Sequence, residues 1–232
     1  EAAWRGVPDI AVGNIVGSNI ANIALIMGIT ALVWPIHVPC ATLRRDTGVM
    51  ILAAVALVPI FMTGQIGRPA GGMLLAGLIG YLVWAYLRPG DMTEDDALDA
   101  EKPKALVSVL WVVAGFVALL FGARFLVDGA VSIARDAGLS EAFIGLTIVA
   151  VGTSLPELAT SVVAAFRRQS EIAIGNVIGS NIFNVLGILG ITAVIQPIPV
   201  AGRFITFDLP VMIALSLAIT ALLLTRPVIG RP

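Results

Sequence analysis

One short stretch of this sequence gathers the side chains best suited to chemistry: GTSLPE, residues 152–157, inside a long apolar run. Glu157 supplies a carboxylate, and Thr153 and Ser154 supply two hydroxyls beside it. Oxygen atoms of these kinds coordinate hard cations such as Ca²⁺ and Na⁺. The stretch therefore predicts a cation-binding site. The alternative is a structural glutamate that is protonated or hydrogen-bonded to a hydroxyl on a neighbouring helix.

Pro156 adds backbone oxygen atoms to this set. Proline has no backbone N–H, and with Gly152 nearby it should kink or break a helix. The break frees carbonyl oxygen atoms such as those of Ala150 and Val151 for a cation. An ionisable side chain at membrane depth costs at least about 2.5 kcal/mol on insertion scales. We therefore expect Glu157 to be functional.

A second polar pattern occurs twice in the chain. Residues 11–38 align with residues 173–200 without a gap, with 16 of 28 positions identical and a constant offset of 162. In each copy a serine and an asparagine four residues apart share one helical face and predict further oxygen ligands. These pairs are Ser18 with Asn22 and Ser180 with Asn184. The match continues downstream, where DTGVMI at 46–51 corresponds to DLPVMI at 208–213.

Other residues of the repeat are predicted to be structural. Four asparagines point away from the ligand faces and are expected to tie helices together: Asn14, Asn19, Asn176 and Asn181. Two glycine pairs have the GxxxG spacing that predicts close helix packing. These are Gly13 with Gly17 and Gly175 with Gly179.

The composition places these motifs in a membrane. The chain is 58% hydrophobic and only 12% charged, whereas soluble domains carry about 25% charged residues. Its apolar runs of about 20 residues match helices that span a hydrocarbon core. A net charge of −1 argues against nucleic-acid binding. The single cysteine, Cys40, excludes a Cys-rich metal site, and His37, the only histidine, is expected in a loop.

The predicted fold class is an all-α polytopic membrane protein with about seven transmembrane helices. Their approximate ranges are 11–34, 46–64, 70–87, 105–127, 142–166, 172–195 and 206–225. Residues 88–104 form an acidic loop. One set of alternate loops carries nine Lys and Arg residues and the other carries five. The positive-inside rule then places the acidic loop in the cytoplasm. We expect a multi-pass monomer in the lipid bilayer of the cell membrane (inner or plasma).

The two copies of the repeat run in opposite directions through the membrane, because they lie in the first and sixth predicted spans. Inverted repeats are typical of transporters that bind substrate near the membrane midplane. The expected halves are residues 1–87 and 105–232, within a ten-helix inverted-repeat fold truncated at both ends. A counterpart of GTSLPE would fall before Glu1. That missing span is expected to supply a second carboxylate, because a lone one leaves Ca²⁺ under-neutralised.

The paired motifs resemble a known family. GTSLPE followed by GNVIGSNIFN, with an earlier GNIVGSNIAN, is similar to the two alpha repeats of the calcium/cation antiporter superfamily. The resemblance covers essentially the whole chain and is strongest to the prokaryotic sodium/calcium exchangers. It implies a ten-span exchanger that binds Ca²⁺ or Na⁺ alternately at a central site, with these ions as substrates and no cofactor.

The resemblance also implies roles for individual residues. Glu157 would be a ligand shared by Ca²⁺ and Na⁺, with Thr153, Ser154 and the Ala150 carbonyl beside it. The remaining ligands would be Ser18, Asn22, Ser180 and Asn184. Potassium-dependent members resemble one another in carrying Asp at the position of Asn184, so this chain favours potassium independence. The first-copy glutamate is absent, so the site is expected to be incomplete within residues 1–232 and not to transport by itself.

Other functions are left open. Within the same class, the protein would be a proton-coupled or potassium-dependent Ca²⁺ antiporter, with Glu157 as the proton carrier in the first case. A passive cation channel is a third possibility. An intramembrane protease with Ser154 as nucleophile is disfavoured, because no Lys or His lies near it to act as a base.

Overall fold

The computed structural model describes residues 8–37, 40–88, 105–138, 150–152, 154–226 and 228–230. Its α-helices are α1 (Pro8–Ala21), α2 (Met27–Val33), α3 (Cys40–Met62), α4 (Arg68–Leu87), α5 (Ala105–Asp136), α7 (Ala150–Gly152), α8 (Leu155–Phe166), α9 (Ser170–Ile182), α10 (Gly190–Ile195) and α11 (Leu209–Thr225). Three segments are π-helical: η1 (Asn22–Ile26), η4 (Phe183–Leu189) and η5 (Phe204–Asp208). Four short strands are β1 (Ile36–His37), β2 (Gln65–Ile66), β3 (Ile198–Pro199) and β4 (Val228–Ile229).

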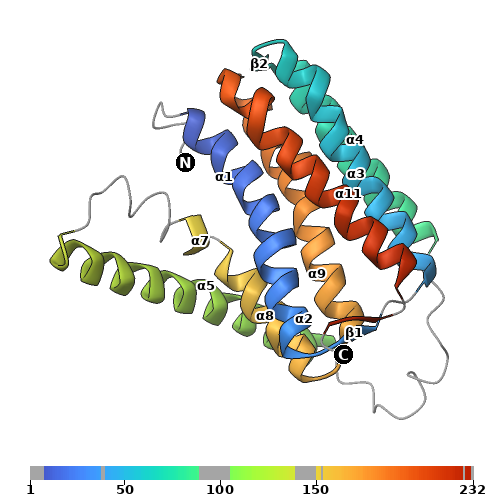
Figure 1. The fold of residues 1–232 in the computed structure, drawn as a ribbon, viewed down its shortest axis with the longest axis vertical. Coiled ribbons are helices and arrows are strands. Elements are labelled where there is room, and N and C mark those ends of the chain that lie inside the picture. The colour runs from blue at the N-terminus through green and yellow to red at the C-terminus, as the bar shows by residue number, and fades with distance from the viewer. Residues whose placement is uncertain are drawn as a thin grey trace.

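A bundle of helices from both copies of the repeat forms the core. α1, α3, α9 and α11 run alongside one another, and α4 flanks them next to α3 (Figure 1). α11 packs on α3 and α1, α3 packs on α9, and α4 packs on α10 and η4. Large aliphatic side chains such as Ile26, Leu57 and Leu189 are fully buried between them. α5 lies across the bundle at one side, against α7 and α8.

Among the described residues, six helical runs are long and apolar enough to cross a membrane: Val12–Val33, Arg45–Met62, Arg68–Leu87, Leu106–Asp136, Ser170–Ile195 and Phe204–Thr225. They correspond to six of the seven predicted spans, with boundaries that agree within about three residues except in α5. We predicted that α5 would end at residue 127, and that boundary is wrong. The helix continues for 32 residues to Asp136, because Asp128 is followed by further helix-compatible residues and lies 4.0 Å from Arg124 one turn earlier.

The remaining predicted span, 142–166, is interrupted where the sequence indicated. α7 ends at Gly152, and α8 begins at Leu155 with Pro156 in its first turn. Proline is tolerated there because the first N–H groups of a helix have no intrahelical partner. The Pro156 break is therefore confirmed. Residues 139–149 and Thr153 lie outside the described residues, as does most of the predicted acidic loop at 88–104.

Two short antiparallel strand pairs occupy equivalent places in the inverted repeat. Ile36 in β1 pairs with Ile229 in β4, and Ile66 in β2 pairs with Ile198 in β3. The offset of 162 turns β1 into β3, and an offset of 163 turns β2 into β4. β1 and β2 lie at opposite ends of the bundle (Figure 1). The operation that exchanges the two copies therefore also exchanges the two ends, as an inverted repeat requires.

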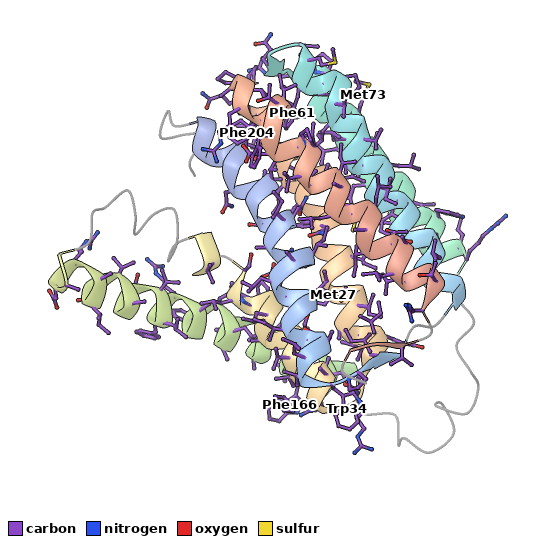
Figure 2. All side chains as sticks on the ribbon, in the orientation of Figure 1. Met27, Trp34, Phe61, Met73, Phe166 and Phe204 are labelled. Carbon is purple, nitrogen blue, oxygen red and sulfur yellow. The ribbon has the colours of Figure 1, made fainter. Side chains whose placement is uncertain are left out.

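Arginines of the two loop sets separate between these ends. At the end with β1, Arg168 lies 4.5 Å from the ring centre of Trp34, and Arg45 donates to the Arg88 carbonyl at 2.8 Å. Trp34 and Phe166 both lie at this end (Figure 2). At the other end, Arg68 directly follows β2, and Arg203 follows β3. These five arginines lie at the ends that the predicted alternation of the loops requires, whereas Arg124 and Arg135 lie in α5, which runs across the bundle.

Within the described residues, the predicted close packing is not found at most of the GxxxG glycines. A Cβ atom added at Gly17, Gly175 or Gly179 would meet none of the described atoms within 4 Å, and one at Gly13 would only touch the Phe204 ring at 3.5 Å. Spacing alone does not show which helix face meets a neighbour. The close approach occurs elsewhere, between α4 and α10.

Gly71 is the residue that permits this approach. A Cβ atom there would lie 2.8 Å from the Gly190 carbonyl oxygen and 2.9 Å from the Val194 nitrogen. We predict that Gly71→Ala destabilises the protein by about 1–3 kcal/mol, a typical cost of overpacking, measured as a lower Tm in detergent. Gly72→Ala is the matched control, because a Cβ atom at Gly72 meets nothing within 4 Å. Equal Tm values for the two variants would contradict the close contact.

Candidate functional site

A chain of amide hydrogen bonds joins the two copies at the centre of the bundle. Asn22, the first residue of η1, donates from Nδ2 to Oδ1 of Asn181 at 3.0 Å. Asn181 in turn donates from Nδ2 to the Met50 sulfur at 3.7 Å. Asn22 and Asn181 are 1% and 2% exposed, and Met50 is 3% exposed. The chain of contacts therefore lies in the interior and passes from α3 to α9 to η1.

The inverted repeat produces a second chain with the same connections. Asn184 in η4 donates to Oδ1 of Asn19 at 3.0 Å, and Asn19 donates to the Met212 sulfur at 3.6 Å. Each residue is offset by 162 from its counterpart in the first chain. The sequence prediction that Asn19 and Asn181 tie helices together is confirmed. Each bond joins a residue of the first copy to one of the second.

Asn22 keeps one oxygen atom without a partner. Its Nδ2 is committed to Asn181, and its Oδ1 is buried and accepts no hydrogen bond. Burying a polar group without a partner costs free energy that a native protein normally avoids. An amide oxygen of this kind is a ligand for a hard cation.

Glu157 holds the second such oxygen atom. Its Oε2 is buried without a hydrogen-bond partner, and it lies in the first turn of α8. Helix α8 packs against η1, which begins at Asn22. The two unpartnered acceptors therefore belong to neighbouring elements, one from each half of the chain.

Two polar contacts fix the start of α8. Asn176 of α9 donates to the Glu157 backbone carbonyl at 3.0 Å and to the Ser161 hydroxyl at 2.9 Å. Ser161 is fully buried and reaches the Ala173 carbonyl at 3.5 Å. The predicted tying role of Asn176 is confirmed. These bonds hold the backbone that carries the Glu157 carboxylate against α9.

The helix break exposes backbone groups beside Glu157. Ser154 is 4% exposed, and its N–H donates to the Val151 carbonyl at 3.0 Å. The Val151 carbonyl, which we expected the break to free, is thus partly occupied. Its second lone pair remains. Ala150 lies in α7, which packs against α1, the helix of Ser18.

Both asparagines that the sequence predicts as ligands, Asn22 and Asn184, lie in π-helical segments. η1 begins at Asn22 and η4 includes Asn184, so the wider helix occurs at equivalent places in the two copies. π-helical turns are frequent at functional sites. Ser18 and Ser180 lie one turn earlier, in α1 and α9, and both are half-buried. The elements that carry the predicted ligands thus pack around one another, while Thr153 lies outside the described residues.

Sequence reasoning missed Met50, Met212 and Ser161 as members of this network. The methionines carried a signal, because both occupy the same place in the doubled VMI segment. An apolar side chain at a repeated position is ordinarily assigned to packing. Ser161 carried none, since a lone serine in an apolar helix has many possible partners.

The chain is similar to known transport proteins. The family model described as "Sodium/calcium exchanger protein" matches residues 1–87 and 107–231. The putative antiporter CaxA of Alkalimonas amylolytica is 41% identical over 226 residues, which cover 94% of this chain and 70% of that protein. The sodium/calcium exchanger MaX1 of Methanosarcina acetivorans is 30% identical, with 93% and 73% covered.

Solved structures show the same likeness. The sodium-calcium exchanger NCX_Mj, soaked with 10 mM Na⁺ and 10 mM Sr²⁺, superimposes with a TM-score of 0.82 at 32% sequence identity. The superposition covers 99% of this chain and 73% of that chain. The same exchanger soaked with zero Na⁺ and Ca²⁺ gives a TM-score of 0.80.

A double-mutant cycle tests the central hydrogen bond. We predict that Asn22→Ala and Asn181→Ala, combined, show a coupling of about 0.5–1.5 kcal/mol in the free energy of unfolding, the net value of a buried hydrogen bond. The control pairs Asn22→Ala with Thr225→Ala, whose hydroxyl bonds only within α11. That pair should be additive within about 0.5 kcal/mol. Additivity of the asparagine pair would show that the contact does not form.

Proposed function

The chain belongs to the sodium/calcium exchanger family, whose members are cation antiporters and not enzymes, and from this premise we propose that it exchanges Ca²⁺ for Na⁺ by alternating access. The observation that carries the proposal is the pair of buried oxygen acceptors without partners, Asn22 Oδ1 and Glu157 Oε2. They come from opposite halves of the chain, on elements in contact. A desolvated cation would supply what both atoms lack.

The proposed ligand set combines these two atoms with their neighbours. Ser154 and the Ala150 carbonyl flank the helix break, and Thr153 follows from the motif. Ser18, Ser180 and the Asn184 carboxamide complete the set around the break. All are oxygen donors, which suits Ca²⁺ and Na⁺ and disfavours metals that prefer sulfur or nitrogen. The transported ions are substrates, and no cofactor is involved.

Exchange follows from competition for shared oxygen atoms. A Ca²⁺ ion and a set of Na⁺ ions that use the same carboxylate and amide oxygens cannot be bound together. Loading one substrate therefore releases the other. The Na⁺ gradient and the membrane potential, worth about 2.3 kcal/mol per charge per 100 mV, would then drive Ca²⁺ against its own gradient. The inverted symmetry supplies equivalent surroundings on the two sides of the site.

The placement of the protein in the membrane is also part of the proposal. α5 presents a continuous series of exposed large apolar side chains, including Trp111, Phe121 and Phe125, which lipid would cover. We assign the protein to the plasma (inner) membrane as a monomer. The end of the bundle with Arg45, Arg88 and Arg168 is assigned to the cytoplasm, since that loop set holds more Lys and Arg.

Transport in vesicles tests the proposed function. We predict that the whole protein, reconstituted into Na⁺-loaded vesicles, takes up radioactive Ca²⁺ when the external medium lacks Na⁺. Glu157→Gln should lower the uptake at least about 10- to 100-fold, because the charged ligand is lost. Glu171→Gln is the control, since Glu171 is an exposed carboxylate in the first turn of α9. Uptake by Glu157→Gln equal to that of the control would overturn the ligand assignment.

The same vesicles distinguish the coupling ion. Collapsing the pH gradient with a protonophore should leave Na⁺-driven uptake intact. Arrest of uptake by the protonophore would favour the proton-coupled alternative, and uptake that requires K⁺ would favour a potassium-dependent exchanger. Conductance without any counter-ion would indicate a channel.

Cysteine labelling tests the assigned orientation. In a Cys40→Ser background, Ala97→Cys should react with a membrane-impermeant maleimide only when the cytoplasmic side is accessible. Gly202→Cys, in the other set of loops and with open space around it, should react from the outside. The reverse pattern would show that the bundle is inserted the other way.

A further inference from the structure

Each asparagine chain ends on a buried methionine sulfur. Met50 is 3% exposed and accepts from Asn181 at 3.7 Å, and Met212 is 1% exposed and accepts from Asn19 at 3.6 Å. A thioether sulfur can accept a hydrogen bond but has none to donate. The end of each chain therefore has a fixed direction.

This direction fixes the orientation of the carboxamide groups in the first chain of hydrogen bonds, which runs from Asn22 through Asn181 to Met50. Rotating a carboxamide by 180° exchanges its oxygen and nitrogen with little change in shape. In the present orientation the NH₂ group of Asn181 donates to the Met50 sulfur, and the oxygen of Asn181 accepts from Asn22. Asn22 must then use its own NH₂ group for Asn181, which leaves its oxygen as the unpartnered atom.

The opposite orientation would be harmful to cation binding. If Asn181 were rotated, its oxygen would face the sulfur lone pairs and its NH₂ group would face the NH₂ group of Asn22. Relief of that clash would require Asn22 to rotate as well. The Asn22 NH₂ group would then occupy the place of Oδ1 and repel a cation.

The second chain follows the same logic through different residues. The NH₂ group of Asn19 donates to the Met212 sulfur, and the oxygen of Asn19 accepts from Asn184. The Asn184 NH₂ group is thereby committed, and its oxygen is left for a ligand. The two chains of hydrogen bonds cross the interface between the copies in opposite directions. Each half therefore contains one asparagine whose orientation is fixed in the same way.

We propose that Met50 and Met212 are positioning residues that fix the carboxamide orientation of Asn22 and Asn184, so that each presents oxygen and not nitrogen to the transported cation. The inference rests on the proposed function, because it assigns these oxygens to the ion site. It adds a role for two apolar side chains that touch no ion.

The competing explanation is packing alone, and a leucine substitution separates it from positioning. Leucine conserves the apolar volume of methionine and is well tolerated in cores, but it removes the sulfur acceptor. Packing alone predicts that leucine leaves the Ca²⁺ affinity unchanged, whereas positioning predicts that leucine weakens it. Glutamine is no substitute for the sulfur, because its carboxamide both donates and accepts and can rotate together with Asn181.

The experiment measures Ca²⁺ uptake against Ca²⁺ concentration for Met50→Leu and Met212→Leu in the whole reconstituted protein. We expect the half-saturating Ca²⁺ concentration to rise about 3- to 10-fold, the loss of one neutral hydrogen bond. The maximal rate should stay unchanged, because the bound ion loses the same contact in the ground state and in the transition state. The Tm should also stay unchanged.

Met27→Leu is the matched control. Met27 is 2% exposed and lies in α2 within the same bundle (Figure 2), and no described hydrogen bond reaches its sulfur. It should keep wild-type affinity. If both Met50→Leu and Met212→Leu also keep it, the positioning role is overturned. A loss of Tm in parallel with affinity would likewise assign the methionines to packing.

The outcome is separable from that of the proposed function. If Glu157→Gln abolishes exchange while both leucine variants match Met27→Leu, the ion site stands and the methionine role falls. If Glu157→Gln exchanges normally, the ion site itself is wrong, and the methionine role falls with it.

Discussion

A polar atom buried in a membrane protein needs a partner, and the centre of this bundle depends on that constraint. Two pairs of asparagines meet the requirement across the interface of the two copies. Other groups meet it within one half, as Asn176 does at the Glu157 carbonyl and Thr30, Ser216 and Thr220 do at carbonyls of their own helices. Asn22 Oδ1 and Glu157 Oε2 do not. Two unpaired acceptors on adjacent elements would destabilise an apolar core, and the proposed cation site would account for their retention.

The inverted repeat explains how so many polar groups are satisfied at once. A contact between the copies that works in one direction is repeated with the roles exchanged, as in the two asparagine chains and the two strand ladders. One favourable geometry is thus used twice. The same doubling makes both faces of the site similar, which an exchanger needs if an ion is to bind from either side.

The sequence predicted the spans, the inverted repeat and the helix break, because hydropathy, a constant offset of 162 and Pro156 are all local or periodic signals. It could not predict partners. Whether Asn22 bonds Asn181 or a neighbour depends on the rotation of two antiparallel helices, which residue spacing does not encode. For the same reason, the described residues show close packing at glycines such as Gly71 and not at most of the GxxxG glycines. The π-helical turns at Asn22 and Asn184 also have no marker in the residues around them.

Neutral amide ligands have a consequence that carboxylates do not share. A carboxylate offers oxygen in either orientation, whereas an asparagine offers oxygen in one and an NH₂ group in the other. A site that uses Asn22 and Asn184 must therefore control the rotation of each side chain. A second asparagine alone cannot do so, because a pair of carboxamides can rotate together and keep its hydrogen bond. The chain has to end on a group that only accepts, and within the described residues Met50 and Met212 occupy that position.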